Sequence, residues 1–245
     1  MKYAVYVEGQ SELLFVADIL QKYSNYDASL CGFKCINLVA DNLCEIKYPS
    51  QGGQYSTNFY QIVNVNNDNR VISKLNKDIP NLLKNGFDII IGLKDVYSET
   101  YEKLCRNPIV DRVSIEKMFQ NQRVCIKDQG ADCRLHFAIM EYEAWILALL
   151  KKSIDAKGSD FNKICEDLKY DIKCDPELTI YHPTKWVREI MQSCGIDYCK
   201  SDSDSYSILS SLTTDDYEAL RYSGRCLSFA KFLDSLFGKD CPNLP

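Results

Sequence analysis

The chain has 245 residues, of which 46% are hydrophobic, and a formal net charge of −5. The length fits one large domain or a domain with a smaller appendage, and the composition is normal for a globular core. The acidic balance excludes bulk electrostatic wrapping of duplex DNA, although it leaves room for a local basic groove. No apolar run approaches the ~20 residues of a membrane-spanning helix and no signal-peptide pattern is present, so we expect a cytoplasmic protein.

Strand-like and helix-like segments alternate over the first 150 residues. Apolar runs predict strands over residues 2–7, 33–39, 59–65, 87–93 and 133–140. Apolar residues at helical spacing predict helices over residues 11–23, 69–84, 114–122 and 143–151. Ser11 is expected to cap the first helix, and Pro80 is expected to divide the second in two. This alternation implies crossover units, and therefore an α/β fold with a mainly parallel sheet flanked by helices.

Polar and glycine-containing stretches mark the predicted loops. Residues 43–57, with Pro49 and two glycines, predict a loop close to the site. Residues 155–158 predict a linker between a main α/β domain of residues 1–152 and a small helical appendage of residues 153–245. In the appendage we expect helices over residues 161–168, 185–194, 215–222 and 227–237, and a polar loop over residues 201–207.

The 12 cysteines lie in apolar segments as often as in loops, and no CxxC pair occurs. A structural zinc site needs four ligands at tight spacings, which this pattern does not offer. Free cysteine behaves as a small hydrophobic residue. We therefore expect buried, reduced thiols rather than a disulfide framework.

Acidic residues follow three of the predicted strands. Glu8 follows the first, Asp95 follows the run over residues 87–93, and Glu141 and Glu143 follow the last. Because the carboxyl ends of parallel strands meet at one edge of a sheet, we expect these carboxylates to converge there. Carboxylate oxygens suit Mg²⁺ or Mn²⁺, which can clamp a phosphate and activate water. The sequence predicts a metal site made of Glu8, Glu12, Asp95, Glu141 and Glu143.

Each acid taken alone has another interpretation, which is a solvated side chain or a charge at a helix N-terminus. Glu141 and Glu143 point the same way only if the chain is extended there, so on a helix one of them would face away. Lys94, beside Asp95, could neutralise a phosphate, and a surface lysine at a strand end is the alternative.

The motif VEGQSE at residues 7–12 resembles the opening motif of TOPRIM domains, in which a strand-end Glu-Gly carries a general acid/base or metal-linked glutamate. The segment IGLKDVY at residues 91–97 resembles the later strand of that fold. The segment IMEYEAW at residues 139–145 resembles part of a TOPRIM-like bacterial family of unknown function. Residues 183–185, Lys200 and Arg221 resemble the tail of the same family.

The resemblance implies that Glu8 is the family glutamate and Asp95 the aspartate of the later strand. We expect Glu141 and Lys94 at the same catalytic site. Related TOPRIM proteins occur as nucleases beside ATPases of the OLD and ABC types in phage defence. The resemblance therefore implies a Mg²⁺- or Mn²⁺-dependent phosphodiester hydrolase that acts on DNA or RNA, with an ATPase as a possible partner.

The usual Asp-x-Asp pair of the family is incomplete, because Leu93 and Tyr97 stand at two-residue spacing from Asp95. A non-catalytic TOPRIM-like module that binds an ATPase partner or nucleic acid is therefore the alternative. A small-molecule phosphotransferase or phosphatase on an α/β sheet is a third hypothesis, since fold alone does not settle function.

Three basic residues are candidate nucleic-acid contacts. Lys185 and Arg188 lie at i, i+3 on one predicted helix, and Arg221 adjoins Tyr222. A solvated helix face is the other interpretation of each. The two histidines, His136 and His182, have no spacing typical of a catalytic pair. No P-loop lysine motif is present, so we do not expect ATP hydrolysis by this chain alone.

Overall fold

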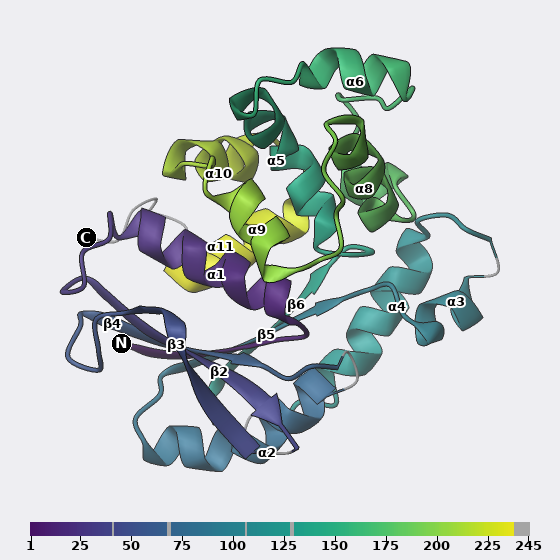
Figure 1. Cartoon of the computed structure of the whole chain (residues 1–245). Coiled ribbons are helices and arrows are strands. Elements are labelled where there is room, and N and C mark those ends of the chain that lie inside the picture. Colours follow the sequence, from purple (N-terminus) through teal and green to yellow (C-terminus); the bar gives the residue numbers. More distant parts are fainter. Residues whose placement is uncertain (41, 68–69, 106, 128–129, 238–245) are drawn as a thin grey trace. The chain divides into compact units, whose positions relative to one another are not determined.

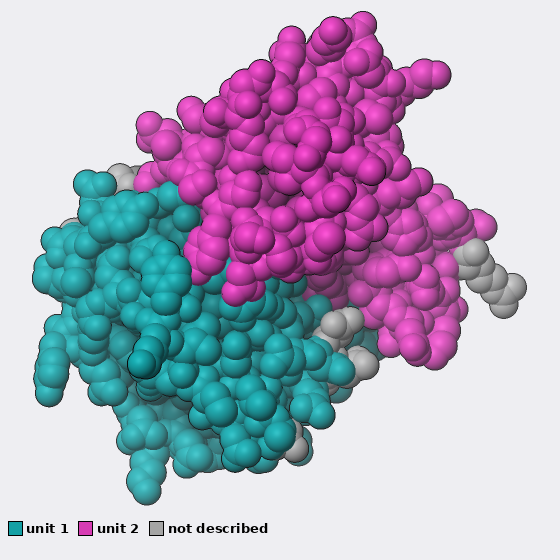
Figure 2. Space-filling view, in the orientation of Figure 1, with its two compact units in different colours: residues 1–94, 116–137, 232–245 teal, residues 95–115, 138–231 magenta. Residues whose placement is uncertain are grey.

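A computed structural model describes residues 1–40, 42–67, 70–105, 107–127 and 130–237 of the chain (Figure 1). The chain divides into two compact units, which Figure 2 shows in different colours. Unit 1 comprises residues 1–94, 116–137 and 232–245. Unit 2 comprises residues 95–115 and 138–231.

A six-stranded sheet with the order β3-β2-β4-β1-β5-β6 is the framework of unit 1. Its strands are β1 (Lys2–Val7), β2 (Cys31–Val39), β3 (Asn42–Gln51), β4 (Asn58–Asn64), β5 (Ile89–Asp95) and β6 (Asp132–Ala138). β1 pairs in parallel with β4 and β5, and β2 pairs in parallel with β4, whereas β3 is antiparallel to β2. The predicted α/β fold with a mainly parallel sheet flanked by helices is confirmed.

Helix α2 (Arg70–Lys84) covers one face of this sheet (Figure 1). Its buried side chains are Val71, Leu75, Ile79 and Leu82, which join one apolar cluster with side chains of β1, β2, β4 and β5. The prediction that Pro80 divides this helix is wrong, because α2 runs through it to Lys84. Ile79 and Leu82 are buried on either side of Pro80, and their packing holds the helix despite the lost backbone hydrogen bond.

Helix α1 (Gln10–Tyr23) covers the opposite face (Figure 1). Its N-cap is Gly9 and not Ser11, because Gly9 is extended (φ −141°, ψ −179°) and the helix already begins at Gln10. The last residues of the described chain pack against the same unit. The ring of Tyr23 stacks on Phe237 with centroids 4.5 Å apart, and the Tyr60 hydroxyl donates to the Leu236 carbonyl over 3.1 Å.

The prediction of a loop over residues 43–57 is wrong for its first part, which forms the edge strand β3. Most side chains of β3 are exposed, so the strand has no apolar alternation to reveal it. Its backbone pairs with β2 instead, and Pro49 is tolerated because an edge strand needs partners on one side only. The strand therefore arises from a tertiary pairing that composition does not report.

Unit 2 is mainly helical. It contains α3 (Glu99–Leu104), α5 (Glu143–Ala156), α6 (Phe161–Asp167), α7 (Pro176–Thr179), α8 (Pro183–Ser193), α9 (Asp202–Leu209) and α10 (Thr214–Tyr222). Two further helices, α4 (Arg112–Arg123) and α11 (Leu227–Phe237), contribute residues to both units. The predicted helices that correspond to α4, α5, α6, α8, α10 and α11 are confirmed, whereas α3 and α7 were not predicted. Of the described helices, none is long and apolar enough to cross a membrane.

Two predicted breaks in unit 2 are wrong in part. The proposed linker begins inside α5, which continues to Ala156 and ends before Gly158, a glycine with φ +81°. The proposed polar loop over residues 201–207 is mostly α9. Ser201 and Asp204 form a capping box, in which each side chain accepts a hydrogen bond from the backbone of the other. The serines and aspartates that suggest a loop are here the start signal of a helix.

The cysteines of the described chain are free, as expected. Burial raises the pKa of Cys31 and of Cys35 to about 12, so both are inert thiols at neutral pH. Cys44, Cys125 and Cys199 are exposed, so the expectation that the cysteines are buried holds for only some of them.

Candidate functional site

The predicted site residues are divided between the two units. Unit 1 contains Glu8, Glu12 and Lys94, and unit 2 contains Asp95, Glu141 and Glu143. Because each unit is a separate compact body, the two groups are described in turn.

In unit 1, the acidic residues lie where β1 turns into α1. Glu8 is 7% exposed, Glu12 is 9% exposed and Lys94, in β5, is 6% exposed. β1 and β5 are parallel neighbours with Tyr6 opposite Gly92, so Glu8 and Lys94 both lie at the carboxyl ends of adjacent strands. This is the edge at which open α/β sheets bind ligands.

Gly9 allows a close approach of the Glu12 carboxylate within this turn. A Cβ atom on Gly9 would lie 2.9 Å from Oε2 of Glu12, so any side chain there would displace that carboxylate. Glu12 stands in the first turn of α1, where the helix dipole favours a negative charge. The position of Glu12 is thus accounted for by the helix start as well as by a metal.

A network of amide side chains, which the sequence pattern did not single out, lies at the same edge of the sheet. Asn64, which ends β4 and is 1% exposed, donates to Oδ1 of Asn37 over 3.1 Å and to Oε1 of Gln10 over 3.4 Å. Its own Oδ1 accepts from the backbone N–H of Asn66 over 2.9 Å. The sequence offered a signal for this residue, because Asn64 lies near the end of a predicted strand, much as Glu8 directly follows β1.

In unit 2, Asp95 is held by the turn that follows β6. Its Oδ1 accepts a hydrogen bond from the backbone N–H of Tyr142 over 2.9 Å. The backbone N–H of Tyr97 donates to the carbonyl of Met140 over 2.7 Å, so the two segments stay paired beyond the strands. Met140 has φ +63°, a left-handed conformation that costs a non-glycine residue ~1 kcal/mol or more. The pairing therefore fixes a strained turn beside Asp95.

Glu143 and Glu141 bond to different elements. Glu143 begins α5 and is 0% exposed, and its Oε1 accepts from Nζ of Lys200 over 2.8 Å and from the hydroxyl of Tyr198 over 3.3 Å. Its Oε2 is buried without a hydrogen-bond partner among the described residues. Oε2 of Glu141 accepts from the backbone N–H of Thr184, the second residue of α8, over 2.8 Å.

These groups act on one another electrostatically. Burial raises the pKa of Glu143 and the charge of Glu141 adds to the rise, whereas Lys200 opposes it. Burial alone would lower the pKa of Lys200, but the carboxylates of Glu143, Glu141 and Asp95 outweigh it and raise that pKa. We call these four residues the acid–lysine cluster. Its three carboxylates outnumber its one ammonium, so it can accept further positive charge.

Three aromatic side chains, Tyr97, Tyr181 and His182, form a group in the same unit. The ring centroid of Tyr97 lies 5.7 Å from that of Tyr181 and 4.9 Å from that of His182. The Tyr97 hydroxyl donates to Glu102 over 2.7 Å, and this bond is the main cause that raises the pKa of Tyr97 to about 12. The charge of Glu141 contributes to the same shift, so this aromatic group neighbours the acid–lysine cluster.

The three basic candidates differ in accessibility. Lys185 has a side chain that is 69% exposed. Arg188 is exposed as well, and its Nε donates to the carbonyl of Tyr198 over 3.3 Å. The side chain of Arg221 is 2% exposed and lies 3.2 Å from Glu218. Arg221 is therefore part of the packing of unit 2 and is not a surface contact, which corrects its assignment as a nucleic-acid residue.

The side chains that could bind a metal ion are the carboxylates described above. In the part of the chain that the structure describes, no group of three or more His, Cys, Asp or Glu side chains is placed to hold a metal ion. Mg²⁺ commonly uses only one or two carboxylates and takes its other ligands from water and substrate phosphates. Asp95 and Glu141 are each oriented by a backbone N–H. Glu143 is engaged by Lys200 instead.

No protein-family model matches the chain, and no curated protein matches it either. Among solved structures, the chain is similar to a proposed cell surface hydrolase from Lactobacillus plantarum WCFS1, with 10% sequence identity and a TM-score of 0.35. The similarity covers 91% of each chain. A TM-score this low carries no argument about function.

Proposed function

We propose that this protein is a metal-dependent phosphodiester hydrolase that cleaves DNA or RNA, with the acid–lysine cluster of unit 2 in its active site. The observation that carries this proposal is the fully buried Glu143, which holds the ammonium of Lys200 within reach of the charges of Glu141 and Asp95. Cleavage of a phosphodiester needs positive charge at the phosphate oxygens and a carboxylate or similar group near the attacking water. The cluster supplies both kinds of group.

The residues have distinct roles in this proposal. Asp95 and Glu141 would hold Mg²⁺ or Mn²⁺, an ion that supplies positive charge to a phosphate and lowers the pKa of a bound water. The backbone N–H groups of Tyr142 and Thr184 keep the two carboxylates in place. Lys200 presents its ammonium to the phosphate, and Glu143 anchors it there.

The aromatic group and helix α8 supply a means of binding nucleic acid. Bases stack on exposed aromatic rings with ~1–3 kcal/mol per base, without sequence preference. His182 is exposed, and Tyr97 and Tyr181 are partly so. Lys185 and Arg188, on α8, can contact the backbone phosphates. Together these features favour a single-stranded substrate.

Further parts of the proposal derive from the TOPRIM resemblance. Within unit 1, Glu8 is proposed as a general acid or base, Glu12 as a metal ligand, and Lys94 as a phosphate contact. An OLD-type or ABC-type ATPase is the proposed partner, in phage defence in the cytoplasm. Burial of Glu8, Glu12 and Lys94 at a ligand-binding edge of the sheet is compatible with these roles.

The test is cleavage of labelled single- and double-stranded DNA and RNA with Mg²⁺ or Mn²⁺. We expect Asp95→Asn and Glu141→Gln each to lower the rate ~10²-fold or more, the usual effect of removing such a group. The matched control is Glu99→Gln, whose side chain is 89% exposed in the same unit. If Asp95→Asn and Glu141→Gln cleave as fast as Glu99→Gln, the cluster is not the active site.

A non-catalytic module is the second candidate. It is favoured by the leucine that stands in place of a second aspartate and by the net charge of −5. In that case no substrate would be cleaved with either metal, while a mobility-shift assay would still detect nucleic-acid binding that the Lys185→Glu, Arg188→Glu double variant weakens. The wild-type protein alone therefore separates the two candidates.

A further inference from the structure

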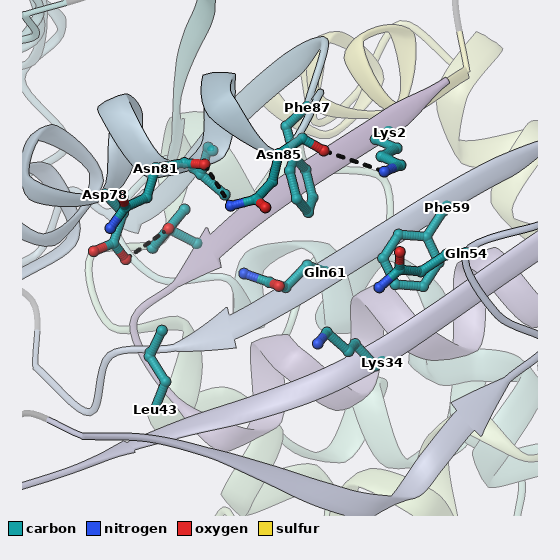
Figure 3. A pocket seen from close by; sticks show the side chains of 12 residues that line it. Lys2, Lys34, Leu43, Gln54, Phe59, Gln61, Asp78, Asn81, Asn85 and Phe87 are labelled. Carbon is teal, nitrogen blue, oxygen red and sulfur yellow. Dashed lines mark hydrogen bonds between the residues drawn. The ribbon is translucent and has the colours of Figure 1, made fainter.

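A polar cavity lies within unit 1, away from every residue assigned above. It has a volume of about 350 Å³ and opens on the sheet face that α2 covers (Figure 3). Its polar lining includes Lys2, Lys34, Gln61, Asp78, Asn81 and Asn85. In an α/β sheet this face is normally filled with apolar side chains, so a polar hollow there requires an explanation.

The strand register explains why the hollow forms. Tyr6, Val63 and Ile36 lie opposite one another across β1, β4 and β2, and all three belong to the apolar cluster under α2. Two residues earlier on each strand, the corresponding row is Ala4, Gln61 and Lys34. Side chains two residues apart on a strand point to the same face. The sheet face thus changes from apolar to polar toward the amino ends of the strands.

The side chains of helix α2 that face the sheet also become more polar toward this end of the sheet. The last turns of α2 present Asp78, Asn81 and Asn85, the residue after the helix, to the cavity. Figure 3 shows Gln61 and Lys34 projecting from the strands on one side and Asp78, Asn81 and Asn85 on the other.

The hydrogen bonds within the cavity show which groups are available. Asp78 is already engaged, since it accepts from the hydroxyl of Tyr6 over 2.8 Å and from Nζ of Lys74 over 2.6 Å. Among the described residues, Lys34 makes only a long contact of 3.4 Å, to Glu45, whose side chain is 61% exposed. In the described part of the chain, the carboxamide of Gln61 makes no hydrogen bond. A partly buried amide and a weakly paired ammonium therefore face the same space.

The remaining ammonium, that of Lys2, donates to the carbonyl of Asn85 over 3.1 Å. With Asp78 neutralised by Lys74, the two lining lysines leave the cavity positively charged. Ammonium groups bind phosphate, and carboxamides both donate to and accept from hydroxyl groups. A volume of about 350 Å³ lies within the range of small-molecule sites.

We propose that this cavity binds a phosphorylated sugar, with the phosphate between Lys34 and Lys2 and the hydroxyl groups on Gln61 and the asparagines of α2. A free sugar phosphate and a mononucleotide share this chemistry. The ligand would occupy unit 1 whether or not the acid–lysine cluster of unit 2 is catalytic, so this inference is independent of the proposed function.

Calorimetric titration of the full chain with ribose 5-phosphate, glucose 6-phosphate, a set of mononucleotides, neutral ribose and inorganic phosphate tests the inference. We expect saturable binding of at least one phosphorylated sugar with a dissociation constant below about 1 mM, and no binding of ribose. Tighter binding of mononucleotides than of the simple sugar phosphates would identify the ligand as a nucleotide. Equal binding of ribose, or binding of inorganic phosphate alone, would overturn the proposal.

Variants locate the site. Lys34→Gln and Gln61→Glu should each weaken binding at least tenfold, whereas the control Lys47→Gln, at an exposed lysine of the neighbouring strand β3, should not. Gln61→Leu removes the amide without adding charge and serves if Gln61→Glu fails to fold. Side-chain amide signals of Gln61 should shift during a titration followed by NMR. Equal affinity of wild type, Lys34→Gln and Gln61→Leu would place the ligand elsewhere and contradict the inference.

Discussion

The two units bury polar groups in different ways. In unit 1, apolar side chains fill most of both sheet faces outside the polar cavity, and the buried acid Glu8 and the buried amide Asn64 lie at strand ends. In unit 2, charged and polar groups lie within the helical packing itself. Glu143 is 0% exposed and paired with Lys200, and Glu177, 3% exposed, accepts hydrogen bonds from Trp145 and Ser228.

This difference has an energetic consequence. A buried carboxylate is tolerated only where specific donors compensate for the water that it has lost. Unit 1 should therefore lose stability mainly when apolar volume is removed, whereas unit 2 should lose it when one partner of a polar pair is removed. The same distinction applies to function, because a buried charged side chain that is paired with a partner is also held in one orientation.

The largest expected effect is on catalysis. It tests whether unit 1 takes part in the cleavage reaction. Glu8→Gln keeps the size of the side chain but removes its charge, so we expect cleavage to fall ~10²–10⁴-fold while the melting temperature changes little. Glu45→Gln, at an acid of unit 1 that is 61% exposed, is the control. Full activity in a folded Glu8→Gln protein would restrict the chemistry to unit 2.

The second prediction tests the apolar packing of unit 1. Leu75 is 0% exposed in the cluster under α2, and Leu75→Ala should lower the free energy of unfolding by about 3 kcal/mol through lost burial and a new cavity. Leu83→Ala on the same helix, at a residue that is 37% exposed, should cost much less. Urea denaturation measures both, and equal losses would show that the cluster under α2 does not hold the unit together.

The third prediction tests the polar packing of unit 2. Lys200→Met leaves the buried Glu143 without its cation, and we expect a loss of about 2 kcal/mol. This figure is below the usual value for a buried pair because the Lys200 side chain is 38% exposed. Adding Glu143→Gln should recover part of the loss, and Lys152→Met, at an exposed lysine of α5, serves as the control. Additive effects of the two substitutions would mean that the pair is not coupled.

The smallest effect concerns the segment that carries Lys200. Asp204 accepts backbone hydrogen bonds from Cys199 over 2.8 Å and Ser201 over 3.0 Å. Burial would raise the pKa of Asp204, but these bonds outweigh it and lower that pKa below its ordinary value of 3.8. The ionised carboxylate is therefore stabilising above that value, and this contribution is lost as the pH falls through the lower folded-state pKa.

Asp204→Ala should accordingly cost about 1 kcal/mol at pH 7, and the difference from wild type should shrink below pH ~4. Asp197→Ala, at an exposed aspartate nearby, should show neither the cost nor the pH dependence. Urea denaturation at a series of pH values measures the difference. A difference that grows as the pH falls would have the wrong sign and would rule out the cap as its source.

The sequence predicted the parts of the fold that follow from local periodicity. Apolar runs identified β1, β5 and β6, and helical spacing identified α2, α5 and α11. It failed for β3, whose exposed side chains carry no pattern and whose backbone depends on β2. It also failed for α9, where a serine and aspartate run is a capping box.

The candidate site shows the same limit. Glu8, Asp95 and Glu141 could be singled out because each follows an apolar strand. The pairing of Glu143 with Lys200, and the burial of Arg221 inside unit 2, depend on where distant segments meet. No spacing in the sequence reports such contacts, so the sequence could not separate a buried anchor from a surface charge.

The most direct test of the central claim, that the acid–lysine cluster of unit 2 is a catalytic metal site, is anomalous diffraction from crystals soaked in Mn²⁺. We predict a manganese peak within about 2 Å of carboxylate oxygens of both Asp95 and Glu141, and its loss in crystals of Asp95→Asn. Absence of any peak at these two residues in the wild-type protein, or a peak that persists unchanged in Asp95→Asn, would contradict the claim.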